Sequence, residues 1–359
     1  MRLNKLIALV ISFAFIVFNC RLSSAQMDIT TWQVNTSHTG VNPTEQTLTP
    51  AFVSGSGNVT CLFAEQVDGQ VNAQPLYLTS TTSTKLPGSF PDGAQHNAVY
   101  VATQNGTVYA IDGDRTSDGC NKVNQNYLWV MPLVNYKNGP TPNGQAEAYE
   151  DIKGAADITP LLGLTETPVI DTVTGTLYVV VSVKDTQDLP AATPFMQVLY
   201  ALDVKTGNVK GFTIIDPEFN GDYTPQACVA NTTCDIVTPS QSGRIPFVPE
   251  HQHLRSALTL DSAHHTLYLA YASHNDQTPY WGLVLGYNVS NPASMTLQGN
   301  STRILPALTK RQASGWAGQV LRSTRIPINC SSQPAMAAGI RTCPAATPMV
   351  RSIPGLTSR

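Results

Sequence analysis

The amino-acid sequence predicts an all-β fold built from repeated units of four antiparallel strands. The first observation is the stretch Asn97–Asp112, NAVYVATQNGTVYAID, in which side chains alternate with a period of two on both sides of Asn105-Gly106. Alternation around an Asn-Gly pair is the strongest short-range signal for a β-hairpin, because these residues tolerate the positive φ of a tight turn. The same layout returns in residues 176–203 and 266–287.

The second observation is the spacing of the tyrosines in these hairpins. Tyr100, Tyr178 and Tyr268 are 78 and 90 residues apart, and Tyr109, Tyr200 and Tyr287 are 91 and 87 residues apart. Each unit also has an entering strand and a closing strand. The entering strands are expected at 73–77, 167–171 and 256–261, and the closing strands near 127–131, 209–215 and 295–305.

Four strands per unit at a near-constant period are typical of β-propeller blades. We therefore predict an all-β β-propeller of about three four-stranded antiparallel blades, near residues 71–131, 167–215 and 254–305 within a propeller region 26–318. Three blades would form an incomplete ring whose first and last sheets each have an open flank. The period exceeds the ~40–45 residues of a compact blade, and the excess lies in long polar loops. A β-sandwich is the alternative architecture.

Composition agrees with a β-rich protein and excludes two classes of partner. Only 13% of the 359 residues are charged, and the chain contains 25 Gly and 25 Pro. The formal net charge of −3 offers no electrostatic basis for binding nucleic acid or an anionic membrane surface.

Residues 1–25 have the layout of a secretory signal peptide. Arg2 and Lys5 precede an apolar run from Leu6 to Phe18, and Ser23-Ser24-Ala25 supplies small residues before a cleavage point. The run is shorter than the ~20 residues that a membrane-spanning helix needs, which disfavours the alternative of an anchor. We therefore expect a secreted or periplasmic protein, with no membrane association after the signal is removed.

Six cysteines remain after the predicted signal, and an even number in an exported chain favours disulfides. Cys228 and Cys234 enclose a short polar loop and are the first candidate pair, and Cys61 with Cys120 is the second. Six cysteines allow 15 pairings, so the other connectivities stay open.

The segment from Gln319 to Arg359 differs in kind from the rest. It has five Arg and five Pro but no acidic or aromatic residue. Such a composition predicts a disordered tail. The abrupt change after Gly318 also fits an aberrant sequence from a shifted reading frame or a truncated gene.

Two segments resemble the repeat of the quinoprotein-like (PQQ-like) β-propeller family. Val108–Asp112 and Leu199–Asn208 are similar to its strand and its A-x-D-x-x-T-G turn, with Ala201, Asp203, Thr206 and Gly207 in the matching positions. The resemblance covers roughly 70–305 and implies an incomplete copy of the propeller. Lys210 and Phe212 stand where the repeat usually has Trp.

The resemblance also implies PQQ and calcium, which quinone-dependent dehydrogenases of the family hold with a vicinal Cys-Cys disulfide, a Trp platform, calcium carboxylates and a catalytic Asp. This sequence has no adjacent cysteines and no matching Trp-Asp constellation. Neither cofactor is therefore supported beyond the resemblance itself. Asp112, Asp171, Asp203 and Asp261 lie at strand ends and are interpreted as turn formers, since an Asp side chain bonds backbone N–H groups in turns.

Histidines are concentrated between residues 251 and 274. His251, His253, His274 and Asp276 are candidate metal ligands, because a His-x-His pair puts both imidazoles on one face of a strand. His264-His265 occupies a position where a hairpin turn is expected.

No motif of a nucleophilic, metalloprotease or phosphate-binding site is present, and we assign no catalytic residue. The sequence favours a secreted β-propeller that binds or scaffolds a protein, glycan or small molecule without catalysis. The alternatives are a relative of a PQQ-dependent dehydrogenase and a metal-dependent enzyme that uses the 251–276 histidines.

Overall fold

The structure is a computed structural model that describes residues 27–55, 59–115, 119–152, 158–191, 193–217, 219–220, 244–245, 247–250, 252–274, 281–298 and 303–306. The predicted signal peptide, the tail from residue 319 and the pair Cys228–Cys234 lie outside this range. Within it, no helix has the length and apolar character needed to cross a membrane.

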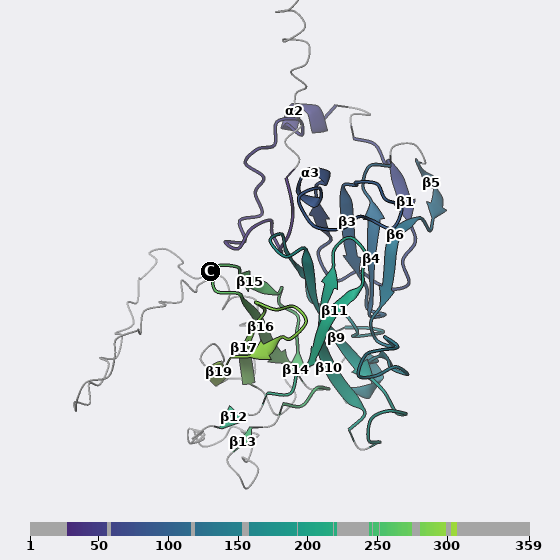
Figure 1. Cartoon of the computed structure of the whole chain (residues 1–359). Helices are drawn as coiled ribbons and strands as arrows, with labels where there is room; N and C mark the ends of the chain where they lie inside the picture. The colour runs from purple at the N-terminus through teal and green to yellow at the C-terminus, as the bar shows by residue number, and fades with distance from the viewer. Residues whose placement is uncertain are drawn as a thin grey trace, which may run out of the picture. The chain divides into compact units, whose positions relative to one another are not determined.

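The described residues form an all-β fold in which three antiparallel sheets follow one another along the chain (Figure 1). The first sheet has the order β2-β3-β4-β6, with β2 at Leu76–Leu78, β3 at Ala98–Ala102, β4 at Thr107–Asp112 and β6 at Tyr127–Pro132. The second contains β8 at Val169–Asp171, β9 at Thr176–Lys184, β10 at Phe195–Asp203, β11 at Val209–Ile214 and the short β7 at Gln145–Ala146.

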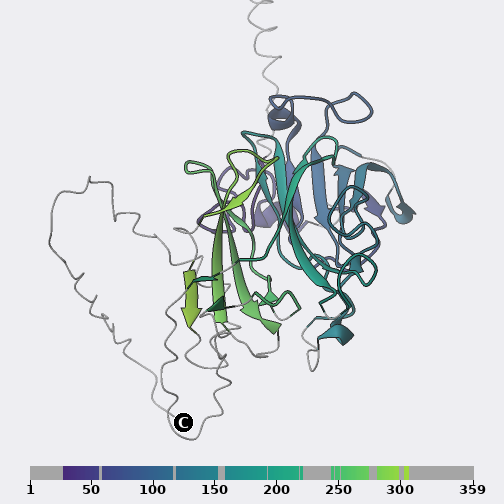
Figure 2. The same ribbon diagram turned by 60° about the horizontal axis from the view of Figure 1, so that its bottom comes forward.

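The third sheet repeats this arrangement with a divided last strand. It contains β14 at Gln252–His253, β15 at Thr259–Asp261, β16 at Thr266–Ser273 and β17 at Trp281–Asn288, and then β18 at Thr296–Leu297 and β19 at Arg303–Pro306. Both β18 and β19 pair with β17, at opposite ends of it. Each sheet thus contains the four predicted antiparallel strands, with the short β7 added in the second sheet and β14 in the third, and the prediction of propeller-type units is confirmed. Figure 2 shows the same strands from a second direction.

The predicted hairpin at Asn105-Gly106 joins β3 and β4. The amide of Thr103 donates to the carbonyl of Thr107, and the amide of Gly106 donates back to the carbonyl of Thr103. Gly106 has a φ of 79°, which only glycine adopts without strain. Asp68 fixes the base of this turn, since its two carboxylate oxygens accept hydrogen bonds of 2.6 Å from the hydroxyls of Thr103 and Thr107.

The strand register shows which positions correspond in the three sheets. Tyr100, Tyr178 and Tyr268 are opposite Leu76, Val169 and Thr259 in the first strands of their sheets, so their predicted alignment is confirmed. The second tyrosine set is wrong by two residues in the third sheet. Leu285, and not Tyr287, takes the place of Tyr109 and Tyr200. Residues two positions apart in a strand have side chains on the same face, so the alternation in the sequence does not distinguish Leu285 from Tyr287.

Short elements occupy the connections. Helix α2 spans Pro50–Val53, α3 spans Ser80–Ser83 and a 3₁₀ turn spans Tyr149–Asp151. Two two-stranded sheets are formed by β1 at Phe63–Glu65 with β5 at Gly119–Asn124, which run parallel, and by β12 at Phe219–Asn220 with β13 at Arg244–Ile245.

Strand β9 is buried on both faces, and its alternation divides the core in two. Leu177, Val179, Val181 and Val183 join a cluster with residues of the first sheet, whereas Tyr178 and Val180 join a cluster with residues of the third. A strand buried on both faces reads as a continuous apolar run, as TLYVVVSV does.

The other flank of the first sheet is not open, contrary to the expectation from the sequence. Phe63 and Val67 pack against Val101, Tyr109 and Ile111 on that face. A disulfide joins Cys61 to Cys120 beside β1 and β5, with 5.7 Å between the Cα atoms. The covering segment therefore shields apolar residues of the sheet and is crosslinked to β5, the strand that precedes β6.

Candidate functional site

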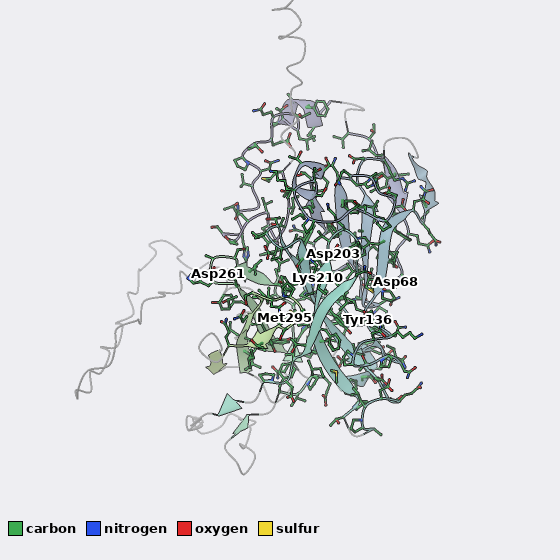
Figure 3. All side chains as sticks on the ribbon, viewed as in Figure 1. Asp68, Tyr136, Asp203, Lys210, Asp261 and Met295 are labelled. Atoms are coloured by element: carbon green, nitrogen blue, oxygen red, sulfur yellow. A yellow bond between two sulfur atoms is a disulfide. The ribbon has the colours of Figure 1, made fainter. Side chains whose placement is uncertain are left out.

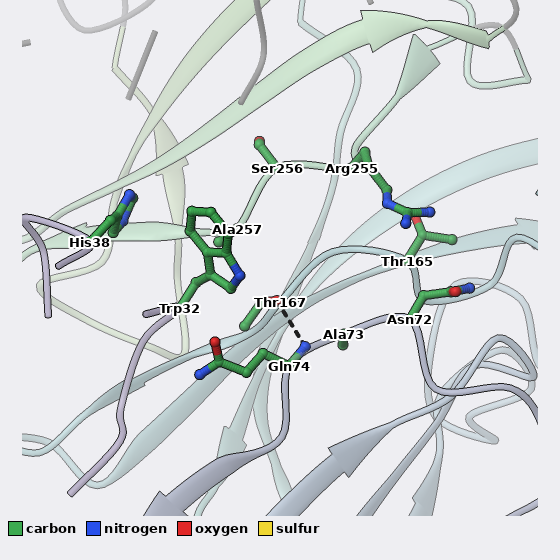
Figure 4. A pocket seen from close by; sticks show the side chains of 10 residues that line it. All are labelled: Trp32, His38, Asn72, Ala73, Gln74, Thr165, Thr167, Arg255, Ser256 and Ala257. Atoms are coloured by element: carbon green, nitrogen blue, oxygen red, sulfur yellow. Dashed lines mark hydrogen bonds between the residues drawn. The ribbon is translucent and has the colours of Figure 1, made fainter. Parts of the chain in front are cut away.

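A pocket of about 510 Å³ lies where the chain enters the three sheets, and we call it the inter-sheet pocket. Figure 4 shows the side chains that line it: Trp32, His38, Asn72, Ala73, Gln74, Thr165, Thr167, Arg255, Ser256 and Ala257. Eight of the ten come from three short segments that precede β2, β8 and β15.

These three segments are equivalent positions of the repeat. Because Leu76, Val169 and Thr259 share one register position, the segments 72–74, 165–167 and 255–257 stand at the same distance before it in each sheet. Each segment carries different side chains at equivalent positions, so a repeat fold can line one site with chemically different groups. The three segments thus line the same pocket although their sequences differ.

Hydrogen bonds connect the three segments to one another. The amide of Gln74 donates to Oγ1 of Thr167 at 3.0 Å (dashed in Figure 4), and the amide of Leu258 donates to the carbonyl of Thr167 at 3.0 Å. Oγ1 of Thr165 donates to the carbonyl of Leu254 at 2.9 Å. The wall of the pocket is therefore held by contacts between sheets, and its shape depends on all three.

A strained N-terminal loop supplies the aromatic side of the pocket. Ile29 pairs with Tyr77 of β2, and the loop that follows carries Trp32 and His38, whose rings meet edge to face at 5.2 Å. Val34 has a φ of 79° and His38 a φ of 52°, in a region that side chains, and β-branched ones above all, rarely adopt. Backbone strain of this kind concentrates at ligand clamps and active sites.

The charge of the pocket comes from one guanidinium. Arg255 is exposed, and no carboxylate in the described part of the chain forms an ion pair with it. Among the described residues, Nδ2 of Asn72 is buried without a hydrogen-bond partner. Two donors without acceptors, beside an indole, suit a planar ligand that carries anionic or carbonyl oxygens.

Glu166 sits inside the same segment but does not line the pocket. Its Oε1 accepts the amide of Val180 at 2.8 Å, so the carboxyl is turned into the sheet. Burial raises the pKa of Glu166 to about 7, although the amides that it accepts lower the pKa in part. The acid braces the segment against β9 and offers no oxygen to a ligand.

The turn motif that carries the resemblance is structural. Oδ1 of Asp203 accepts the amides of Lys205 and Thr206, each at 3.0 Å, and Gly207 has a φ of 71°. The other strand-end aspartates also accept amides of the following turn, two or three residues on, and the interpretation as turn formers is confirmed for Asp112, Asp171, Asp203 and Asp261.

Lys210 replaces the expected Trp with a polar contact. Its Nζ donates to the carbonyls of Thr174 and Gly175 at 3.0 and 2.9 Å and lies 3.3 Å from Oδ2 of Asp203 (Figure 3). A Trp of the first sheet packs against the same turn: Trp129 of β6 donates from Nε1 to the carbonyl of Val204 and packs on Gly207. The motif therefore docks the first sheet onto the second.

The predicted histidine site is only partly within the described residues. His253 and His274 come together with stacked rings, 3.9 Å between centroids and 13° between planes. Imidazole lone pairs lie in the ring plane, so nitrogens of two parallel rings do not converge on one ion. His251 and Asp276 lie outside the described residues. His264 and His265 form the hairpin turn as predicted, with Nδ1 of His264 at 2.8 Å from Oδ2 of Asp261.

Comparison with known proteins gave no match to any family model and no match among curated proteins. Among solved structures, the chain is similar to the quinohemoprotein alcohol dehydrogenase of Comamonas testosteroni, with 12% identity, 78% of this chain and 42% of that one covered, and a TM-score of 0.35. A second quinohemoprotein alcohol dehydrogenase, from Pseudomonas putida HK5, gives 10% identity, 76% and 40% coverage and a TM-score of 0.32.

BamB from Moraxella catarrhalis is also similar, with 14% identity, 66% of this chain and 51% of that one covered, and a TM-score of 0.25. The chain thus spans about half or less of the length of these structures. Likeness of this degree assigns neither an activity nor a cofactor to the chain.

The donors of the inter-sheet pocket differ from those that PQQ and calcium require. Calcium takes oxygen ligands, with carboxylates foremost, and the described residues that line the pocket include no Asp or Glu. They include no cysteine either, although Trp32 could serve as an aromatic platform. The residues present do not fit a calcium–quinone pair.

Proposed function

We propose that the protein is an exported β-propeller-type binding module whose inter-sheet pocket holds a small planar ligand with anionic oxygens. One observation carries this proposal: Arg255 and Asn72 present donors without acceptors beside Trp32, on equivalent segments of the repeat. The Cys61–Cys120 disulfide and the signal-like residues 1–25 support export, because disulfides persist in oxidising compartments.

A role in binding rather than catalysis fits the chemistry of the lining. General acid–base or nucleophilic catalysis needs a reactive group within hydrogen-bond reach of a base. The described residues that line the pocket include no Cys, Lys, Asp or Glu that would act as a nucleophile or a carboxylate base. The pocket can orient a ligand through its donors and the indole.

Benzoate is the probe for this proposal, with glucose as a neutral comparison, and the readout is calorimetric titration of the mature full-length protein. We expect benzoate to bind and Arg255→Gln to weaken binding at least about tenfold, since a hydrogen bond to a charged group contributes about 1.5–3 kcal/mol. Trp32→Leu should also weaken it. Lys85→Gln, which removes an exposed charge elsewhere, should leave it unchanged. Equal affinity of the Arg255→Gln and Lys85→Gln variants would overturn the proposal.

The rival function is that of a quinone-dependent dehydrogenase relative, which the A-x-D-x-x-T-G turn favours by resemblance. Mixing the protein with PQQ and calcium and following dye reduction with alcohols or aldose sugars separates the two. Turnover would contradict the non-catalytic role. The absence of carboxylates from the pocket lining leads us to expect none.

A further inference from the structure

A second cluster of functional groups lies at the end of the first sheet. Ala98 of β3 pairs with Asp112 of β4, so the residue before β3 and the turn after β4 meet at one edge. His96, Asp112 and Asp114 bring one ligand atom each within 4.8 Å of one another there. From the sequence, Asp112 is interpreted only as a turn former, and neither His96 nor Asp114 is a candidate ligand.

The two ring nitrogens of His96 face two carboxylates. Nε2 lies 2.8 Å from Oδ2 of Asp92, and Nδ1 lies 3.2 Å from Oδ1 of Asp112. A neutral imidazole has one N–H and one lone pair. If Nε2–H donates to Asp92, the lone pair of Nδ1 is left facing an anionic oxygen. That contact is repulsive unless a second proton or a cation lies at Nδ1.

The distance at Nδ1 fits a bound cation. A charge-assisted N–H···O bond is typically about 2.7–2.9 Å long, as the contact with Asp92 is, whereas 3.2 Å is longer. A nitrogen and an oxygen bound to one zinc ion at ~2.0–2.1 Å with a tetrahedral angle are about 3.3 Å apart. The pair His96 and Asp112 is therefore already spaced as two ligands of one ion.

The surroundings of His96 match the second layer of a metal site. A ligating histidine almost always donates its other ring N–H to a carboxylate or carbonyl, which fixes the tautomer and the orientation of the ring. Asp92 fills that role, and Phe90 packs edge to face on the ring at 5.4 Å. Asp114 is itself fixed by the backbone amide of Asn97 at 2.9 Å.

The local charge also favours a cation. Asp92, Asp112 and Asp114 surround one imidazole, and among the described residues no Lys or Arg forms an ion pair with any of them. Three carboxylates around one imidazole attract a positive charge to this place.

We propose that His96 Nδ1, Asp112 and Asp114 form a binding site for a divalent transition-metal ion such as zinc, with Asp92 holding His96 in the ligating tautomer. One nitrogen and two carboxylate oxygens suit zinc or manganese better than calcium or magnesium, which prefer oxygen alone. Asp114 is exposed, and its two carboxylate oxygens accept hydrogen bonds from the backbone amide and the side-chain amide of Asn97. A carboxylate oxygen has a further lone pair that can face an ion. Solvent completes the coordination.

Zinc titration of the untagged full-length protein tests the site, with isothermal calorimetry and thermal shift as readouts. We expect the wild type to bind one zinc ion per chain. The His96→Gln and Asp112→Asn variants should each bind zinc at least tenfold more weakly. Asp92→Asn should weaken it by about 10–100-fold without removing a ligand, as loss of a second-layer partner does.

The matched control is His264→Gln. His264 also contacts a strand-end aspartate, Asp261, at 2.8 Å, but among the described residues no second carboxylate forms an ion pair with it. Zinc binding should be unchanged in this variant. Failure of the wild type to bind zinc, or equal affinity in the His96→Gln and His264→Gln variants, would overturn the proposal. If His96→Gln does not fold, the Asp112→Asn and Asp92→Asn variants decide, since Asn keeps the oxygen that accepts the turn amide of Asp114.

Discussion

At the scale of single residues, buried acids set the response of the protein to pH. Glu166 is fully enclosed, and its pKa of about 7 compares with an ordinary value of 4.5. Between these values the unfolded chain loses a proton that the folded protein keeps. The raised pKa therefore lowers the free energy of unfolding. This loss of stability is absent below pH 4.5, grows as the pH rises and is complete above about pH 7.

Glu166→Gln should remove this loss of stability, because a glutamine side chain does not ionise. Its amide oxygen still accepts the hydrogen bond from the amide of Val180. Relative to the wild type, we expect the variant to gain stability as pH rises from 5 to 8, by up to about 3 kcal/mol, because each pKa unit corresponds to ~1.4 kcal/mol. Urea unfolding at several pH values measures this difference. The exposed Glu45→Gln variant should show no such gain, and a difference between Glu166→Gln and wild type that does not vary with pH would contradict the assignment.

At the scale of elements, the turn after β10 is where the first sheet docks on the second. The carbonyl of Val204 accepts both Nε1 of Trp129 and the hydroxyl of Tyr100, at 3.0 and 2.9 Å. A Cβ on Gly207 would lie 2.6 Å from Cε3 of Trp129. The glycine is needed for its φ of 71° and also for the close approach of the indole.

Gly207→Ala and Gly88→Ala separate these two effects. Gly88 has a φ of 77° and nothing within 4 Å of its missing Cβ, so alanine there meets only the backbone cost of about 1–2 kcal/mol. Gly207→Ala should be worse by a further ~1–3 kcal/mol, the usual cost of overpacking. Urea unfolding midpoints compare them. Equal destabilisation would mean that the contact with Trp129 does not matter.

The same elements show what the sequence could and could not predict. The hairpin at Asn105-Gly106 and the turn at Asp203 follow from local chemistry, and both were predictable from a few adjacent residues. The segments 72–74, 165–167 and 255–257 have no local signal, since only strand register reveals that they correspond. His96 was missed for a similar reason: it lies in a loop rich in Ser, Pro and Gly, and its partner Asp112 had a sufficient role as a turn former.

At the scale of the whole molecule, the three sheets depend on one another through the middle one. The alternation in β9 assigns Val179 to the cluster shared with the first sheet and Val180 to the cluster shared with the third. The mostly apolar run TLYVVVSV predicted a strand, but a run that does not alternate between apolar and polar residues does not show which neighbouring sheet each side chain faces. Each valine is a separate probe of one interface.

Val179→Ala and Val180→Ala should therefore destabilise different parts of the protein by similar amounts. Both valines are fully buried, and each truncation should cost about 1–3 kcal/mol, the range typical of a cavity-forming change. In a repeat architecture, nearest-neighbour interfaces carry much of the stability. Hydrogen exchange followed by mass spectrometry should report faster exchange in β3 and β4 for Val179→Ala, and in β16 and β17 for Val180→Ala. Both variants would lose protection uniformly across the three sheets if the molecule opened only as a single cooperative unit, and that pattern would contradict the separate interfaces inferred from β9.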